Sequence, residues 1–203
     1  MTTAVSTAFA VHRLAPSVSM ESDGDFVVAW LSSAAGVTGD IVARRFGANG
    51  SPLGDGFQVS SGTGGKAAPA VASDNGGNFM VTWRDTAATP DRVYARLYDA
   101  AGAAQGGEFP VGDMSPNANA DDGPSVSSDG SFVIAWTGTD ADGTGILARR
   151  YNWAGQAHGP AFVVNSITPG NQQQPAVAVD NLSGFYVTWY DPGQNGADVF
   201  VRA

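Results

Sequence analysis

The stretch Phe132-Val133-Ile134-Ala135-Trp136 decides the fold, because its pattern of Phe, aliphatic residue and Trp occurs four times in the chain. The other copies run from Phe26 to Trp30, from Phe79 to Trp83 and from Phe185 to Trp189. The tryptophans that end successive copies are 53 residues apart. A fixed period near 50 residues indicates a repeat architecture in which each unit packs on its neighbours.

The alternation within the stretch predicts a β-strand that is covered on both faces. Side chains two residues apart share a face, so Phe132, Ile134 and Trp136 lie together, while Val133 and Ala135 fill the other side. Both faces are apolar, whereas a strand with one face in water carries polar residues on that face. We therefore predict that the repeated tryptophans are structural core residues. These are Trp30, Trp83, Trp136 and Trp189.

Each repeat contains three further strand patterns around this one. The strand before it follows a proline and consists of Val between Ser or Ala residues, as in Pro124-Ser125-Val126-Ser127. Such small side chains are expected where several sheets converge. An Asp-containing turn such as Asp129-Gly130 leads into the Phe–Trp strand. A third strand carries an arginine in constant register, and a short Phe-x-Val strand with polar neighbours suits an outer edge.

The two ends of the chain predict how the sheets close. After Trp189 there is a third strand, Val199 to Arg202, but no fourth, whereas a strand of the fourth type occurs near the start as Phe9-Ala10-Val11. Pairing these two segments gives sixteen strands and a closed four-bladed β-propeller, a fold that protects its edges by radial repetition. We expect one domain over residues 1–203, with blades at about 16–61, 69–113, 124–166, and 175–203 plus 7–13.

Two other arrangements fit the same repeats. The chain could be a fragment of a longer propeller, which would also begin and end within a repeat. Alternatively, two copies could form an eight-bladed ring, with this chain as half of it. The expected oligomeric state is accordingly a monomer or a homodimer.

Composition restricts the partners. The net charge of −9 opposes binding to nucleic acid, because no basic patch is available to offset phosphate repulsion. No apolar run is long enough to insert in a membrane. Cysteine is absent, which excludes disulfides and thiolate metal sites. The start, Met1 to Arg13, has no signal-peptide pattern.

The full pattern resembles a known repeat. Pro-x-Val-x-x-x-Asp-Gly-x-Phe-Val-Val-x-Trp, followed by Ile-x-Ala-Arg-Arg-Phe and Gly-x-x-Phe-x-Val, is similar to a repeat of large bacterial secreted and surface proteins. Pro124 to Val164 is the closest copy. The resemblance implies an extracellular or cell-surface location as part of a larger protein, and a role in adhesion or carbohydrate contact without a common catalytic site.

Several side chains outside the core pattern are candidates for ligand contact. Trp153 interrupts the repeat in a turn and Tyr190 follows Trp189 at a strand end, so either ring could stack on a sugar. Asp121 and Asp122 precede Pro124 and could face the same end of the ring. The register arginines are predicted to be structural, paired with the turn aspartates Asp23, Asp74, Asp129 and Asp180. They are Arg44, Arg96, Arg149 and Arg202.

One loop offers a candidate metal site. Asp140 and Asp142 form an Asp-x-Asp-Gly sequence that could begin a calcium loop. The complete loop needs a further ligand and a closing Glu, and Thr144 to Arg150 lacks that Glu. A simple turn is the alternative. Calcium bound at Asp140 and Asp142 is the one cofactor considered; no other is expected.

The sequence predicts a non-catalytic ligand-binding or adhesion module, with a glycan or another surface ligand as partner. A structural spacer within a larger surface protein is the first alternative. A glycoside hydrolase or sialidase-like enzyme is the second, although glycosidases need paired carboxylates and the chain has two glutamates only, Glu21 and Glu108.

Overall fold

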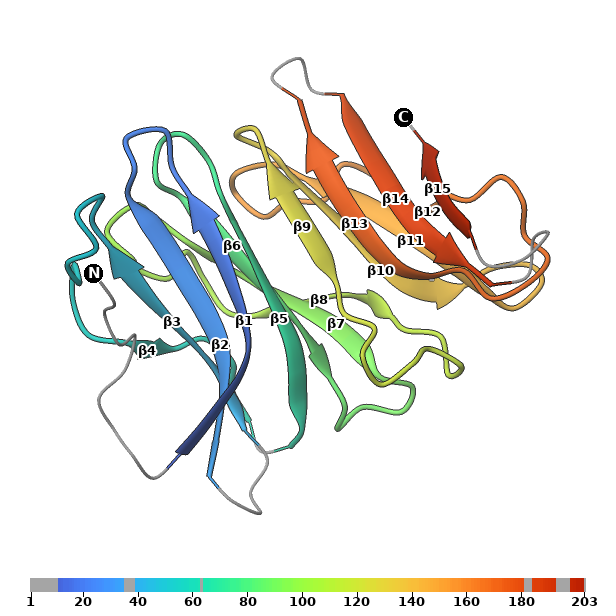
Figure 1. The fold of residues 1–203 in the computed structure, drawn as a ribbon, viewed down its shortest axis with the longest axis horizontal. Coiled ribbons are helices and arrows are strands. Elements are labelled where there is room, and N and C mark those ends of the chain that lie inside the picture. The colour runs from blue at the N-terminus through green and yellow to red at the C-terminus, as the bar shows by residue number, and fades with distance from the viewer. Residues whose placement is uncertain (1–10, 35–38, 63, 181–183, 193–197, 203) are drawn as a thin grey trace.

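The protein is a row of four antiparallel β-sheets (Figure 1). The computed structural model describes residues 11–34, 39–62, 64–180, 184–192 and 198–202, which contain fifteen strands and no helix. The prediction of an all-β fold is confirmed. Those ranges contain no apolar helix of membrane-spanning length.

Each sheet follows the chain order of its strands. The first contains β1 (Val11–Met20), β2 (Phe26–Ala34), β3 (Asp40–Phe46) and β4 (Phe57–Gln58). The second contains β5 (Lys66–Ser73), β6 (Phe79–Asp85), β7 (Arg92–Tyr98) and β8 (Phe109–Asp113). The third contains β9 (Ser125–Ser128), β10 (Phe132–Thr139), β11 (Thr144–Tyr151) and β12 (Phe162–Val163). The fourth contains β13 (Gln173–Val179), β14 (Phe185–Asp191) and β15 (Asp198–Arg202).

The core consists of three apolar junctions between successive sheets. In the first, Val27 and Ala29 of β2 pack with Phe79, Val81 and Trp83 of β6. The same relation joins the second sheet to the third and the third to the fourth. All four repeated tryptophans are buried. The two apolar faces of each Phe–Trp strand thus serve two different neighbours.

The small inner strands lie where the sheets converge. Strand β1 packs against β5, β5 against β9, and β9 against β13. Serine hydroxyls of one inner strand accept hydrogen bonds from amides of the next: Val71 N to Ser17 Oγ (3.1 Å) and Ser73 N to Ser19 Oγ (2.9 Å). Small side chains are needed because a larger one would hold these backbones apart.

Among the described residues, no strand pairing closes the ring as predicted. Val11 lies at the start of β1, where it pairs with Ala34 of β2, and β15 pairs with β14. Phe9 and Ala10 lie outside the described residues. The first strand is longer than predicted because a bulge at Ala15 allows it to continue through Pro16.

Arg96, on the third strand of the second sheet, has other partners than predicted. Arg96 donates from Nη1 to Val59 O (3.1 Å), and its guanidinium lies 5.7 Å from the centre of the Tyr98 ring. Asp74, its expected partner, accepts hydrogen bonds within its own turn, from the amides of Gly76 and Asn78. The carboxylate of Asp74 is therefore occupied within its own turn.

The other three register arginines also bond backbone carbonyl groups. Arg44 and Arg149 donate to Gly54 O and Gly159 O, and Arg202 donates to Val164 O. The bonds of Arg44 and Arg149 anchor their strands to the segments that follow them in the chain. The bond of Arg202 anchors its strand to the preceding sheet. The register arginines therefore stabilise the scaffold through carbonyl groups and aromatic rings.

Candidate functional site

Buried polar side chains gather at one end of the sheets, which we call the bulged end. It is the end where β5, β9 and β13 begin and where β6, β10 and β14 finish. A protein interior accepts polar groups when they are hydrogen-bonded, so such a cluster requires a reason. The buried polar residues at this end include Lys66, Arg84, Asp122, Thr137, Asn165, Gln172, Gln173 and Asp191.

The backbone at this end is strained at equivalent places. Ala15, Ala68 and Gln174 have positive φ angles of 48°, 47° and 54°, and each precedes a proline of an inner strand. A non-glycine residue in this conformation costs on the order of 1–3 kcal/mol, and such residues concentrate at functional sites. In β1, β5 and β13 the strand register shifts at the same point. The strain is thus a regular feature of the bulged end.

In the third sheet the equivalent position is a glycine, and its size matters. A Cβ on Gly123 would lie 2.5 Å from Ala68 Cβ, too close for two carbon atoms. We expect Gly123→Ala to lower the free energy of unfolding by about 1–3 kcal/mol, because the loop must move away from β5. Urea denaturation measures the change. Gly107→Ala is the control, since a Cβ there meets nothing within 4 Å and should change stability by less than about 0.5 kcal/mol.

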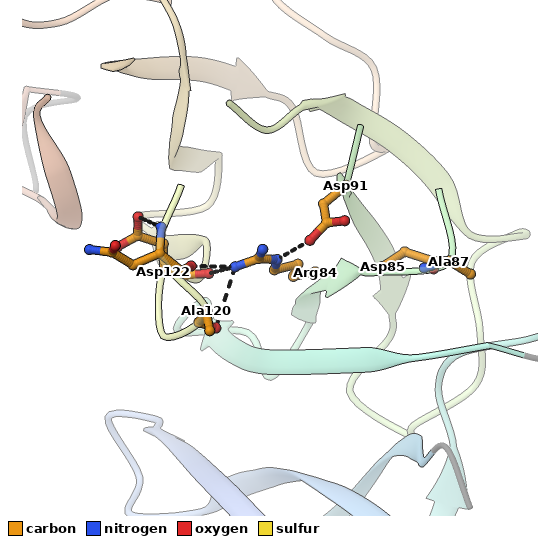
Figure 2. Close-up of polar contacts among 7 residues, drawn as sticks. Arg84, Asp85, Ala87, Asp91, Ala120 and Asp122 are labelled. Carbon is orange, nitrogen blue, oxygen red and sulfur yellow. Dashed lines mark hydrogen bonds and ion pairs between the residues drawn. The ribbon is translucent and has the colours of Figure 1, made fainter. Parts of the chain in front are cut away.

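Arg84, at the end of β6, is the centre of the cluster. Its Nε donates to Asp91 Oδ2 at 2.5 Å, forming an ion pair. Its Nη1 donates to the carbonyl oxygens of Asn119 (2.5 Å), Asp122 (3.2 Å) and Ala120 (3.3 Å). Figure 2 shows the guanidinium between Asp91 and the loop that carries Ala120 and Asp122. One buried cation therefore ties the loop before β9 to the second sheet.

Asp122 is completely buried in this loop, beneath the exposed residues Asn119 and Ala120. Its Oδ2 accepts a hydrogen bond from Asn119 N (2.9 Å). Among the described residues its Oδ1 has no partner at ordinary hydrogen-bond geometry, although Thr137 and the Gln174 amide face the carboxyl group. Burial raises the pKa of Asp122, and the amides and Arg84 oppose that effect only in part. The Asp122 carboxyl group is therefore a weaker acid in the folded protein than in the unfolded chain.

This shift in pKa predicts how stability depends on pH. The folded state binds the Asp122 proton more tightly than the unfolded state does. Its stabilising contribution is therefore complete below the unfolded pKa, about 3.9, and is lost as pH rises through the folded pKa. As pH rises from about 4 to about 7, we expect the free energy of unfolding to fall less for Asp122→Asn than for the unsubstituted protein. Urea denaturation across this range tests it; parallel curves would contradict the expectation.

Other carboxylates at this end are paired but more accessible. Asp85 accepts from Lys66 Nζ at 3.0 Å, and Asp113 from Arg92 Nε at 2.5 Å. A depression of about 400 Å³ is lined by Pro90, Asp113, Pro116 and Trp136 among others. Pro90 in its lining directly precedes Asp91 in the chain. The bulged end therefore combines a buried acid, solvent-accessible carboxylates and a hollow surface.

The sequence-predicted ligand residues divide between the two ends. Asp121 is exposed and Asp122 buried in the loop before β9, and half-buried Tyr190 pairs with Gln173 at the same end. Trp153 is 70% exposed in the turn after β11, at the opposite end. Three of the four residues are thus near one another along the bulged end, and Trp153 is not.

The candidate calcium residues form a turn. Asp140 Oδ1 accepts from Asp142 N (3.0 Å), and Asp140 Oδ2 accepts from Asn165 Nδ2 (3.0 Å). The Asp142 residue is exposed. Within the described part of the chain, no three acidic or histidine side chains come together in an arrangement that could hold a metal ion.

Sequence reasoning missed Arg84 and Asp91, yet a signal was present. Arg84 directly follows the repeated Trp83. The residues that follow the other repeated tryptophans are Leu31, Thr137 and Tyr190, so a charged residue at this position departs from the pattern. A charge that replaces an uncharged residue inside a repeat must have a local partner. Comparing repeats for their exceptions, rather than their common residues, would have pointed to Arg84.

Solved structures place this architecture among known folds. The chain is similar to an endo-arabinase from Bacteroides thetaiotaomicron, with a TM-score of 0.56 and 14% identity over 92% of this chain and 72% of that one. It is also similar to a Hadza microbial sialidase, with a TM-score of 0.63 and 14% identity over 94% of this chain and 44% of that one. The fold is propeller-like.

A third similar structure is an α-L-arabinofuranosidase from Lactobacillus brevis, with a TM-score of 0.51 and 14% identity over 94% of this chain and 67% of that one. The chain spans less than half of the sialidase and about two thirds of the arabinofuranosidase. No family model matches the sequence, and no curated protein sequence matches it. At these identities the likeness concerns the fold.

The comparisons correct the predicted function. A non-catalytic adhesion module was expected, but the similar solved structures are glycoside-cleaving enzymes, such as the arabinase and the sialidase. The hydrolase alternative is therefore better supported. The prediction gave too much weight to the scarcity of glutamate, because aspartates can supply both carboxyl groups of a glycosidase.

Proposed function

We propose that this chain is part of a propeller-type glycoside hydrolase whose catalytic groups lie at the bulged end. The observation that carries the proposal is the buried Asp122, with its raised pKa, in the loop that Arg84 joins to Asp91. Glycosidases need one carboxyl group that is protonated near neutral pH and another that is ionised. Asp122 and Asp91 supply two carboxyl groups in contrasting surroundings, and Arg84 joins the Asp91 carboxylate to the backbone carbonyl of Asp122.

The two carboxyl groups have different roles in this proposal. Asp122 is the general acid, which protonates the oxygen of the leaving sugar. Asp91 forms an ion pair with Arg84 and serves as the carboxylate that stabilises or attacks the sugar ring, or activates water. Because Asp122 is completely buried, the proposal requires the turn at Asn119 and Ala120 to move for substrate to reach it. Three carbonyl bonds from Arg84 hold that loop in the structure.

The substrate class in this proposal is a glycan. The similar solved structures include an endo-arabinase, a sialidase and a protein of the GH130 family of mannoside phosphorylases, which supports a sugar polymer or conjugate without selecting one. The 400 Å³ depression beside Asp113 has the volume of a small-molecule site. Pro90 and Pro116 in its wall are exposed and offer apolar surface for a sugar ring.

The experiment is a hydrolysis screen with the purified chain. Aryl arabinofuranosides, mannosides and sialosides are incubated with it, together with arabinan, and released sugar is measured. We expect turnover with at least one substrate and loss of that turnover in Asp122→Asn and Asp91→Asn. Sugar release that persists in both variants would contradict the assignment of these residues.

A second candidate is a repeat segment of a larger bacterial surface protein. The close agreement of Pro124 to Val164 with the secreted-protein repeat favours it. In that role the propeller would be one extracellular module among several. Sequencing the regions that flank the gene tests this; further Phe-x-Val-x-Trp repeats are expected, and their absence would argue against it.

A further inference from the structure

Every junction within the chain pairs two different faces of a sheet. We call the side carrying Phe and Trp of the second strand the Phe–Trp face, and the other side the reverse face. At the first junction the reverse face of the first sheet, with Val27 and Ala43, covers the Phe–Trp face of the second, with Val71 and Val81. The next two junctions repeat this relation. The order of sheets therefore has a direction.

At the two ends of the row, one face of each kind remains uncovered in the described residues. On the Phe–Trp face of the first sheet, Val18 is 62% exposed, whereas its counterpart Val71 is buried. Phe26 and Val28 on the same face are half-buried, although their counterparts in the next two sheets are fully covered. An apolar depression of about 180 Å³, lined by Leu14, Pro16, Val28 and Trp30 with Arg13, lies there.

The reverse face of the fourth sheet is exposed at the matching positions. Tyr186 is 50% exposed, whereas Val27, Met80 and Val133 at the same repeat position are buried. Val201 is 65% exposed, although its counterparts in the other three sheets, all alanines, are completely buried. Exposed apolar surface of this kind marks an interaction site. Figure 1 shows the first and fourth sheets at opposite sides of the row.

The inner strands indicate which partner fits. The first and third sheets have serine pairs, Ser17 with Ser19 and Ser125 with Ser127, whereas the second and fourth have alanines at those positions. We call these two kinds serine sheets and alanine sheets. The serine hydroxyls of a serine sheet accept hydrogen bonds from backbone amides of the alanine sheet that follows it, as in Val177 N to Ser125 Oγ (3.0 Å). An alanine sheet is followed by a serine sheet at the β5–β9 junction. The fourth sheet is of the alanine type, and the first is of the serine type.

We propose that the reverse face of the fourth sheet packs on the Phe–Trp face of the first sheet of a second copy of this chain. That contact would repeat the junction between the second and third sheets. Two copies related by a two-fold axis make the contact twice, so both uncovered faces of both chains are buried and a ring is closed. This inference is independent of the proposed hydrolase activity.

Light scattering and analytical ultracentrifugation of the full 203-residue chain test the proposal. We expect a dimer for the unsubstituted chain. Val18→Arg and Tyr186→Arg each place a charge in both junctions of a dimer and should raise its dissociation constant about 100-fold or more, because an unpaired buried charge is costly. Trp153→Arg is the control, since Trp153 is exposed in a turn away from both faces. This variant should form dimers with an unchanged dissociation constant.

Mixing the two variants gives the decisive result. A Val18→Arg chain keeps its fourth sheet intact and a Tyr186→Arg chain keeps its first sheet intact, so the mixed pair retains one unaltered junction. We expect the mixture to dimerise where each variant alone is monomeric. A monomeric unsubstituted chain, as when a longer polypeptide supplies the neighbouring sheets, would overturn the proposal. So would open-ended association, or a mixture that remains monomeric.

Discussion

Asp122→Asn is expected to reduce kcat for glycoside hydrolysis by about 100- to 10,000-fold, the usual contribution of a general acid. Asparagine has nearly the same shape and can keep the bond from Asn119 N, but it has no proton to give to a leaving sugar. KM should change little. Steady-state kinetics on a substrate from the hydrolysis screen measures both constants. An unchanged kcat would rule out Asp122 as the acid.

Two further readouts separate lost chemistry from altered folding. The fall in kcat/KM at high pH, which reports the acid, should disappear in the variant. A substrate with an acidic phenol as leaving group needs no proton, so its hydrolysis should be affected much less. Asp55→Asn is a matched control, because Asp55 is exposed in the loop between β3 and β4. This control should leave kcat unchanged.

Trp136→Ala is expected to lower the free energy of unfolding by about 3–5 kcal/mol, the usual cost of removing a large buried aromatic side chain. Trp136 lies in the junction between the second and third sheets. Its Nε1 also donates to Asp113 O (3.1 Å). Truncation would therefore leave a cavity and remove a hydrogen bond next to the candidate site.

Urea or thermal denaturation measures this loss, and the chain contains its own control. Trp153→Ala removes the same side chain from an exposed turn and should change stability by less than about 0.5 kcal/mol. If the two variants lost equal stability, the assignment of the repeated tryptophans to the core would be wrong.

Much of the scaffold could be predicted because its signals are local. The alternation in Phe132 to Trp136 specified strands with two covered faces, and the proline-led Ser and Ala strands indicated convergence. Both patterns reflect the geometry of a single strand, in which neighbouring side chains point to opposite sides. The site was predicted only in part: Asp121 and Asp122 were found, whereas Arg84 and Asp91 were not.

By itself, the sequence determined that this protein is a tandem of four antiparallel sheets in chain order, because period and alternation act within each repeat. The tertiary structure decided that Val11 joins β1 instead of the edge of β15, and that Arg84 meets the loop of Asp122. Of the residues that the structure describes, it also left one apolar face uncovered at each end of the row. These features depend on contacts between segments far apart in the chain, and the repeat pattern is the same whichever of those contacts forms.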